Sequence, residues 1–323
     1  MRLSRFVLFF MVLLCAPSAL AETRLAEIKA RGSVSCAAFP RPGLAMQHGS
    51  DTKGLYVELC HAITVAALGE NAKQEFRVLE APQDVEALRR GEIDVAFLSG
   101  SEFVNRALLD AVTPGPAVFY ASYALLLEAN STAQTPDDLS GVPICFNQSR
   151  SEYQALEDRF AKKGLVFVRL GFEEDVELLD AYNSRHCRSA LAEATELAAI
   201  RLRKGVNRFD SRILAEPLAV FPILAATPKG DAQWARIVAW TVHVLQAAEQ
   251  KESAWLPGGA KALPLNGPDL GLDAAWRARV LAAVGDYGAI YERSLGDKSP
   301  YKLARGVNAL WSAGGLIAPP IAE

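Results

Sequence analysis

The sequence lacks the features that would place it in a specialised class. Its 323 residues are 50% hydrophobic, 22% charged and 8% aromatic, and no internal repeat or low-complexity run occurs. This composition is typical of a folded globular chain and excludes extended disorder, collagen-like repeats and coiled coil. The formal charge is only -3, with 34 basic against 37 acidic residues. Nucleic acid and anionic membranes are therefore not indicated as partners.

Motifs of nucleophilic catalysis and phosphate binding are also missing. The chain has no GxSxG, no P-loop and no GxGxxG after an apolar run. A zinc site is the alternative use of cysteine and histidine, but no CxxC spacing occurs and the four histidines are scattered. Two Cys–His neighbours, Cys60–His61 and His186–Cys187, lie far apart in the chain. We therefore expect neither a metal nor another cofactor.

An apolar run at the N-terminus indicates an export signal. Residues 6–15 are continuously apolar and follow two basic residues, Arg2 and Arg5. The run is too short to span a bilayer, which requires about 20 residues. Small side chains at Ala19 and Ala21 match a signal peptidase site. We expect residues 1–21 to be a signal peptide cleaved after Ala21, an uncleaved membrane anchor being the less favoured alternative.

Short apolar or β-branched runs alternate with segments of helical pattern along the remaining chain. The expected strands are 34–38, 75–79, 95–98, 142–146, 165–170, 213–214 and 218–224. The expected helices are 23–29, 55–68, 83–90, 102–109, 151–162, 173–181 and 232–250, with a mostly helical tail from Leu272. Alternation of this kind predicts an α/β fold.

Two boundaries divide these elements into lobes. A polar stretch at 129–134 precedes Thr135, a suitable N-cap, and Pro136 at the first helical position. A second boundary is indicated near Pro217, so that the chain leaves the first lobe, builds the second and returns. The predicted parts are lobe 1 (22–128 and 217–260), lobe 2 (129–216) and a helical C-terminal extension packed on lobe 1 (261–323).

Four cysteines remain once the expected signal peptide is removed. An even number in an oxidising compartment predicts two disulfides, with three possible connectivities. Cys36 and Cys60 lie in lobe 1, and Cys145 and Cys187 lie in lobe 2. Any other pairing would bind the lobes together across the hinge. We therefore expect the bonds Cys36–Cys60 and Cys145–Cys187.

Two strand-to-helix turns, one in each lobe, have the S-x-x-E spacing of a capping box. They are Ser99 to Glu102 and Ser149 to Glu152. Such a turn is by itself a well-formed helix start, but helix N-termini also bind anions. Arg106 would add a guanidinium for a carboxylate, although an arginine alone is more often a solvated surface residue. The pair of turns favours a cleft for a small zwitterion or anion beyond the carboxyl ends of the strands.

Several segments carry a family likeness along most of the mature chain: 32–36, 54–60, 216–218, 230–234 and 284–320. Through them the chain resembles the solute-binding proteins of ABC transporters for general and polar L-amino acids, the family 3 extracellular solute-binding proteins. The resemblance implies a two-lobed periplasmic binding protein fold of type II, with each lobe a central sheet flanked by helices. It also implies a periplasmic, monomeric, non-enzymatic protein with an inner-membrane ABC permease as partner.

Carried over to this sequence, the resemblance assigns ligand contacts in both lobes. Arg106 is expected to hold the ligand α-carboxylate, with Ser99 and Ser101 beside it, and Glu193 to take the α-ammonium group. Other cleft positions depart from the family pattern, namely Leu44, Tyr56, Ser149 and Arg150. An arginine at the last position would favour an additional anionic group or would fill the space. These departures indicate a retuned ligand or a cleft without ordinary amino acid affinity.

Three hypotheses follow. The favoured one is a substrate-binding component that binds an amino acid or a related small zwitterion or anion and delivers it to a permease. The alternative is a periplasmic sensor or accessory binding protein with altered or lost amino acid affinity. The third is a dehydratase-like enzyme on the same fold, with Glu193 or Glu102 as general acid, but no second acid–base partner is evident.

Overall fold

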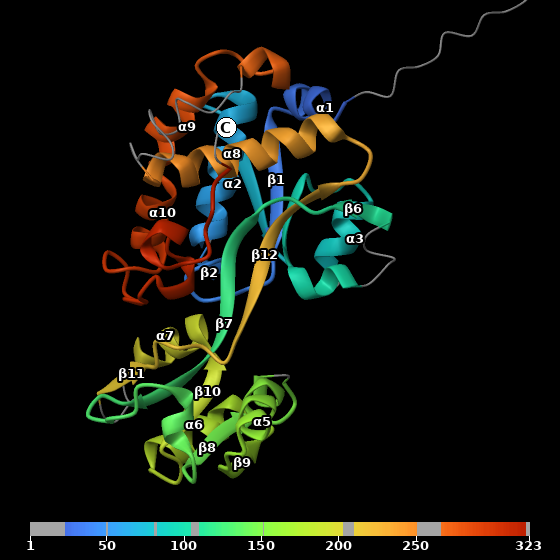
Figure 1. Cartoon of the computed structure of the whole chain (residues 1–323). Coiled ribbons are helices and arrows are strands. Elements are labelled where there is room, and N and C mark those ends of the chain that lie inside the picture. Colours follow the sequence, from blue (N-terminus) through green and yellow to red (C-terminus); the bar gives the residue numbers. More distant parts are fainter. Residues whose placement is uncertain are drawn as a thin grey trace, which may run out of the picture.

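The computed structural model shows two lobes joined by a pair of long strands (Figure 1). It describes residues 23–49, 51–80, 83–104, 110–150, 152–202, 210–250 and 266–320. The predicted signal peptide and Arg106 lie outside the described residues. Within these ranges, no helix combines the length and the apolar character that crossing a membrane would require.

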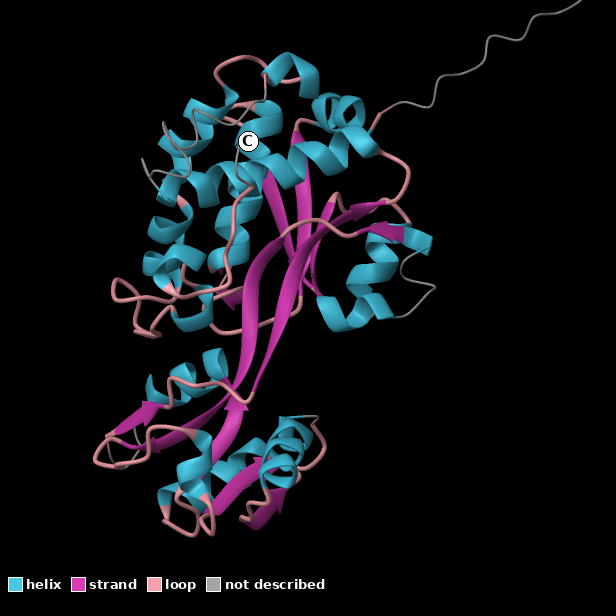
Figure 2. Ribbon diagram, in the orientation of Figure 1, coloured by secondary structure: helices cyan, strands magenta, loops and turns pink. Residues whose placement is uncertain are grey.

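One sheet of ten strands continues through both lobes, as the strands in Figure 2 show. Eight strands follow each other in the order β4-β1-β5-β12-β7-β10-β8-β9. Their bounds are β1 Ser33–Ala38, β4 Lys73–Val78, β5 Val95–Ser99, β7 Ala117–Glu128, β8 Pro143–Asn147, β9 Val168–Phe172, β10 Ser189–Glu193 and β12 Ala219–Pro228. The short strands β6 (Val112–Thr113) and β11 (Ser211–Ile213) pair with β12 and β7, and β2 (Met46–His48) pairs with β3 (Asp51–Lys53).

The two lobes are linked by β7 and β12, which run antiparallel between them. β7 has 12 residues and therefore extends about 40 Å. Its first half pairs with β12, and its second half pairs with β10 of lobe 2. β12 also pairs antiparallel with β5, whereas β1 is parallel to β4 and β5, and β8 is parallel to β9 and β10. The carboxyl ends of parallel strands from both lobes therefore lie near the crossing strands.

Helices cover both faces of the sheet in each lobe (Figure 2). Lobe 1 carries α1 Arg24–Arg31, α2 Leu55–Leu68, α3 Gln83–Arg89 and α8 Ala232–Gln250. Lobe 2 carries α5 Glu152–Lys163, α6 Asp175–Asn183 and α7 Ala194–Leu202. The C-terminal extension contributes α9 Trp276–Val284 and α10 Tyr287–Ser294, followed by the 3-10 helices η5 Gly306–Asn308 and η6 Trp311–Ala313.

The hydrophobic cores are separate in the two lobes. The largest cluster joins α1, β1, α2 and α8 to the extension, with Trp276 and Tyr287 fully buried. The extension thus completes the core of lobe 1. In lobe 2, Leu125 and Leu127 of β7 enter one cluster, while Leu126 enters another. Successive side chains of a strand point to opposite faces, so β7 supplies the core on both sides of the lobe-2 sheet.

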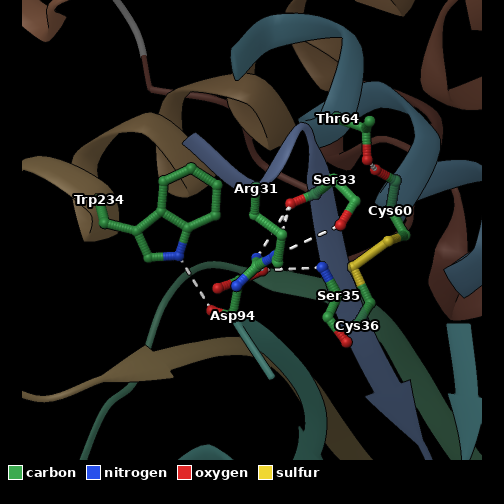
Figure 3. The surroundings of a disulfide bond; sticks show 8 residues. All are labelled: Arg31, Ser33, Ser35, Cys36, Cys60, Thr64, Asp94 and Trp234. Atoms are coloured by element: carbon green, nitrogen blue, oxygen red, sulfur yellow. Dashed lines mark hydrogen bonds and ion pairs between the residues drawn. A yellow bond between two sulfur atoms is a disulfide. The ribbon is translucent and has the colours of Figure 1, made fainter. Parts of the chain in front are cut away.

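Both predicted disulfides are confirmed, Cys36–Cys60 between β1 and α2 and Cys145–Cys187 between β8 and the segment before β10. Figure 3 shows Asp94 close to the first bond. Its buried carboxylate accepts the N–H of Ser35 at 2.7 Å and pairs with Arg31, while its carbonyl accepts from Trp234 Nε1 at 2.9 Å. Burial raises the pKa of this carboxyl. Asp94 therefore joins the start of β5 to α1, β1 and α8.

The α/β prediction is confirmed, and most predicted elements occur with small shifts at their ends. The helices predicted at 55–68 and 232–250 have the observed bounds of α2 and α8. The strand predicted at 165–170 is displaced to Val168–Phe172. The tail is less helical than predicted, because its last part contains short 3-10 helices and extended segments. Thr135 is the N-cap, as predicted, and forms a capping box with Asp138, but the helix that it opens is a single 3-10 turn, η2 Pro136–Leu139.

Candidate functional site

A cavity of about 190 Å³ lies at the carboxyl ends of β1 and β5. Its lining side chains come from the loop after β1, from α2, from β5 and the turn that follows it, and from β12. They are Phe39, Arg41, Tyr56, Phe97, Ser99, Glu102 and Ile223. The lining thus combines apolar side chains with a hydroxyl group, a guanidinium and a carboxylate, a mixture typical of sites for small polar ligands.

Ser99 and Ser101 form the polar turn after β5. Their Oγ atoms are 2.8 Å apart, and the N–H of Ser101 donates to Ser99 Oγ at 3.4 Å. The helix predicted at 102–109 begins earlier, as the 3-10 helix η1 Gly100–Val104, and residues 105–109 lie outside the described part of the chain. The structure therefore brings both serines together, whereas the role of Arg106 stays a prediction.

Tyr56 and Leu44 occupy different environments, although both are expected cleft residues. The Tyr56 ring stacks on Phe97 with centroids 4.8 Å apart, and its buried hydroxyl has no hydrogen-bond partner among the described residues. Burial raises the pKa of this phenol. Leu44 is fully buried in the lobe-1 core, and its carbonyl accepts the N–H of Tyr56 at 3.0 Å. Leu44 thus holds the backbone of Tyr56 through this hydrogen bond and does not itself line the cavity.

Glu193 provides the facing carboxylate from lobe 2. It ends β10, at the carboxyl edge of the lobe-2 sheet, and only 3% of it is exposed. Its Oε1 accepts the hydroxyl of Thr195 at 3.0 Å, and its Oε2 forms an ion pair with Arg41. Arg41 belongs to lobe 1, so this ion pair joins the two lobes directly. Both oxygens of the expected ammonium-binding carboxylate are therefore engaged.

The second strand-to-helix turn is organised by contacts within lobe 2. Arg150 lies 2.6 Å from Asp175 and 2.7 Å from Glu196. Its charge is therefore balanced by carboxylates of its own lobe. Ser149 turns back toward the strand, with its N–H and hydroxyl both donating to Asn147 Oδ1, at 3.0 and 2.6 Å. In this structure Arg150 is not a free cation for an additional anionic group.

Arg41 is a charged cavity residue that the sequence reasoning missed, as it missed the apolar lining residues Phe39, Phe97 and Ile223. It lies in the turn Pro40–Arg41–Pro42–Gly43, which is closed by backbone hydrogen bonds with Ala45 at 3.0 and 3.1 Å. The guanidinium also stacks over the Phe39 ring, 5.6 Å from its centroid. The sequence feature that could have indicated this residue is an arginine between two prolines, shortly after the strand predicted at 34–38. It gave no indication that the side chain reaches the other lobe.

The loop after β1 contacts lobe 2 over a wider area than this one pair. A second cavity, of about 240 Å³, lies between Pro40, Pro42 and Met46 on one side and residues of α6 and α7 on the other. The loop after β1 therefore faces α6 and α7 of lobe 2 across this cavity. Two α/β lobes, joined by crossing strands and facing each other with polar groups at their strand ends, define a solute-binding architecture.

Comparisons with known proteins agree with this class. The chain matches no protein-family model. It is 31% identical over 330 residues to the general L-amino acid-binding periplasmic protein AapJ of Rhizobium johnstonii, covering 96% of each chain. It is 28% identical over 326 residues to the glutamate/glutamine/aspartate/asparagine-binding protein BztA of Rhodobacter capsulatus, covering 95% of each.

A solved structure extends the likeness to the whole fold. An ABC transporter periplasmic binding protein from Brucella ovis with glutathione bound superposes with a TM-score of 0.71 and 27% identity. The match covers 93% of this chain and 99% of that chain. The chain belongs to the family of amino-acid-binding periplasmic proteins of ABC transporters. The two-lobed periplasmic binding protein fold expected from the resemblance is thereby confirmed.

Proposed function

We propose that the protein binds an amino acid or a closely related small molecule between its lobes and delivers it to an inner-membrane ABC permease. The observation that supports the proposal is the cavity at the carboxyl ends of β1 and β5, which Ser99 and Arg41 line, together with the ion pair between Arg41 and Glu193 of lobe 2. Hydroxyl groups suit a carboxylate, and a buried carboxylate suits an ammonium group. Closure of the hinge would bring both to one zwitterion.

The individual roles in this proposal follow the family pattern. Arg106 and the two serines would hold the α-carboxylate, and Glu193 would take the α-ammonium group. We further propose a monomer that is exported to the periplasm and cleaved after Ala21. An enzymatic role is not part of the proposal. Glu193 pairs with Arg41 and accepts the Thr195 hydroxyl, so both of its oxygens contact groups of the chain itself.

Titration calorimetry of the mature protein with a panel of amino acids, dicarboxylates and small amines tests binding. A ligand at 100 times its Kd should stabilise the folded state by about 2.7 kcal/mol in thermal unfolding. Replacing Arg106 by Ala should remove most of the affinity. Arg90→Ala is the matched control, because the Arg90 side chain is 51% exposed and pairs with Glu92 on the surface. The absence of any response to the panel would refute the proposal.

A sensor or accessory role is the second candidate. The observation that favours it is the ion pair between Arg41 and Glu193, which supplies the expected ammonium site with a cation from the chain itself. In that role the protein would bind a partner protein without first requiring an amino acid. Tight binding of an amino acid to the wild-type protein, with transfer to permease-containing vesicles, would exclude it.

A further inference from the structure

A third cavity, of about 240 Å³, lies beside the crossing strands. Among the described residues, its lining has no member in common with either of the two cavities at the cleft. It is formed by β7, by α7 and the segment from β11 to Pro217, and by the C-terminal extension. Figure 1 shows α7 and the extension on the same side of the crossing strands. An occupant would therefore touch lobe 2, a strand that links the lobes, and the extension at once.

Four basic side chains line this cavity, and its described lining includes no acidic one. The four are Arg201 of α7, Arg212 of β11, and Lys302 and Arg305 of the extension. Arg305 is balanced by an ion pair with Glu249. Arg212 donates to the backbone carbonyls of residues 131 and 133, which carry no net charge. Three of the four cations therefore lack a carboxylate partner in the part of the chain that the structure describes.

The two cations that have no partner of either kind among the described residues are Arg201 and Lys302. Arg201 is half-buried in the last turn of α7, where a cation also stabilises the helix dipole. Lys302 has φ 44°, in the left-handed region that residues other than glycine rarely adopt. Like charges gathered in one cavity repel each other, and an anion among them would remove this repulsion.

Carboxylates on the same elements do not supply this anion, because most of them are paired elsewhere. Glu196 of α7 pairs with Arg150 at 2.7 Å, Glu216 pairs with Arg159 at 2.6 Å, and Glu128 of β7 lies 3.5 Å from Arg185. Asp210, directly before β11, is exposed and is not part of the lining. The positive charge of the cavity is thus left for an external group.

The rest of the lining is largely apolar and includes Phe119, Ile213, Leu214, Pro217, Leu303 and Val307. A volume of 240 Å³ corresponds to about eight water molecules at liquid density, which suits a small molecule better than a peptide segment. An inorganic anion would leave the apolar walls without contacts. An organic anion with an apolar body matches both parts of the lining.

We propose that this cavity is a second binding site, which takes a small organic carboxylate with an apolar body, such as an aromatic monocarboxylate. Its carboxylate is held by Arg201, Arg212 and Lys302, and its body contacts the apolar walls. Charge-assisted hydrogen bonds from guanidinium groups are among the strongest polar contacts of a carboxylate. The ligand needs no ammonium group, so this site differs in chemistry from the one proposed at the cleft.

Titration calorimetry of the mature protein at low ionic strength tests the proposal with benzoate and phenylacetate. Benzamide and phenylacetamide are the neutral counterparts, and inorganic phosphate is the anion without an apolar body. At least one acid should bind with a Kd of about 1 mM or lower, and at least about tenfold more tightly than its amide. Phosphate should bind more weakly than that acid.

Two substitutions remove the cations that lack partners. Arg201→Gln and Lys302→Asn should each weaken binding of the acid by at least about fivefold. Asparagine is chosen at position 302 because it tolerates a positive φ. The matched controls are Arg236→Gln, on the exposed side of α8, and Lys298→Asn, exposed in the extension. Neither control residue lines the cavity, so each should change the affinity by less than about twofold.

Arg106→Ala separates this site from the cleft. Loss of acid binding in Arg201→Gln and in Lys302→Asn, with affinity retained in Arg106→Ala and in both controls, supports the assignment. Binding of neither acid, equal binding of acid and amide, or unchanged affinity in Arg201→Gln or Lys302→Asn overturns it. Phosphate that binds as tightly as the better acid, or acid binding that is lost in Arg106→Ala, also overturns it. All of these results leave the proposed amino acid binding intact, because the probes carry no ammonium group.

Discussion

Tyr120 and Asn308 are joined by two hydrogen bonds that imitate the pairing of neighbouring strands. The N–H of Tyr120 donates to Asn308 Oδ1 at 2.7 Å, and Asn308 Nδ2 donates to the carbonyl of Tyr120 at 3.0 Å. Tyr120 belongs to β7, which crosses between the lobes, and Asn308 ends η5 of the C-terminal extension. The extension is thus tied to the strand on which the hinge depends.

Removing this amide should destabilise the protein substantially. Asn308 is only 4% exposed, so Asn308→Ala leaves the backbone donor and acceptor of Tyr120 without partners at a poorly hydrated site. The expected loss is about 2–4 kcal/mol in urea unfolding. Asn266→Ala is the control, because Asn266 is exposed and makes no side-chain capping bond, and it should change stability by less than about 0.5 kcal/mol. Similar losses in both variants would contradict the role of Asn308.

The two disulfides should contribute independently. They close loops with sequence separations of 24 and 42 residues, which corresponds to about 3–4 kcal/mol each in the chain-entropy description. Cys36 and Cys145 lie in different hydrophobic clusters, so the losses in the two double-alanine variants should add in the fourfold variant. Chemical unfolding of the three variants measures this. A clear departure from additivity would show that the bonds are coupled through the hinge.

Glycine at position 54 should be required by the turn that places Tyr56. Gly54 has φ 136°, and an added Cβ would lie 2.3 Å from the carbonyl oxygen of Leu44. Gly54→Ala should therefore cost at least about 2 kcal/mol more than Gly69→Ala, since Gly69 has φ 92° but open space around it. The Leu44 carbonyl also accepts from Tyr56, so ligand affinity should fall in the first variant. Equal unfolding free energies would show that the backbone adjusts freely.

Asp137 should make part of the stability dependent on acid pH. Hydrogen bonds from Arg159 and Lys163 lower the pKa of Asp137 to about 2. Because the folded-state pKa lies below the unfolded value, this contribution is complete above about pH 4 and is lost as the pH falls toward 2. Wild type and Asp137→Asn should therefore converge in melting temperature between these values. The Asp137 side chain is 26% exposed and that of its partner Lys163 is 51% exposed, so the difference should be small and should shrink further in high salt.

The sequence predicted the scaffold better than the cleft. The bounds of α2 and α8 could be read directly, because long apolar patterns are interrupted at Gly54, at Gly69 and near Gly230. β10 and α7 were missed, since the five residues Ser189–Glu193 contain two alanines and too little β-branched character to predict a strand. The strand forms because pairing with β7 and β8 buries it on both sides. Tertiary packing there outweighs local propensity.

The candidate site shows the same division. Ser99, Ser101 and Glu193 were predicted as ligand contacts from motif spacing and family resemblance, whereas Arg41 was not. The ion pairs of Arg150 with Asp175 and Glu196 could not be predicted from the sequence either. They depend on how β9, α6 and α7 pack around the lobe-2 turn. A side chain's charge can be read from the sequence, but its partner cannot.

The amino-acid sequence by itself determined the α/β alternation, the export signal as a prediction, and the disulfide pairing once two lobes were inferred. These properties depend on local patterns and on which residues share a lobe. Only the tertiary structure decided that Glu193 meets Arg41 and that Asn308 meets Tyr120. Each of these contacts joins segments far apart in the chain, and its existence depends on the path of β7 and β12 between the lobes and on the packing of the extension against them.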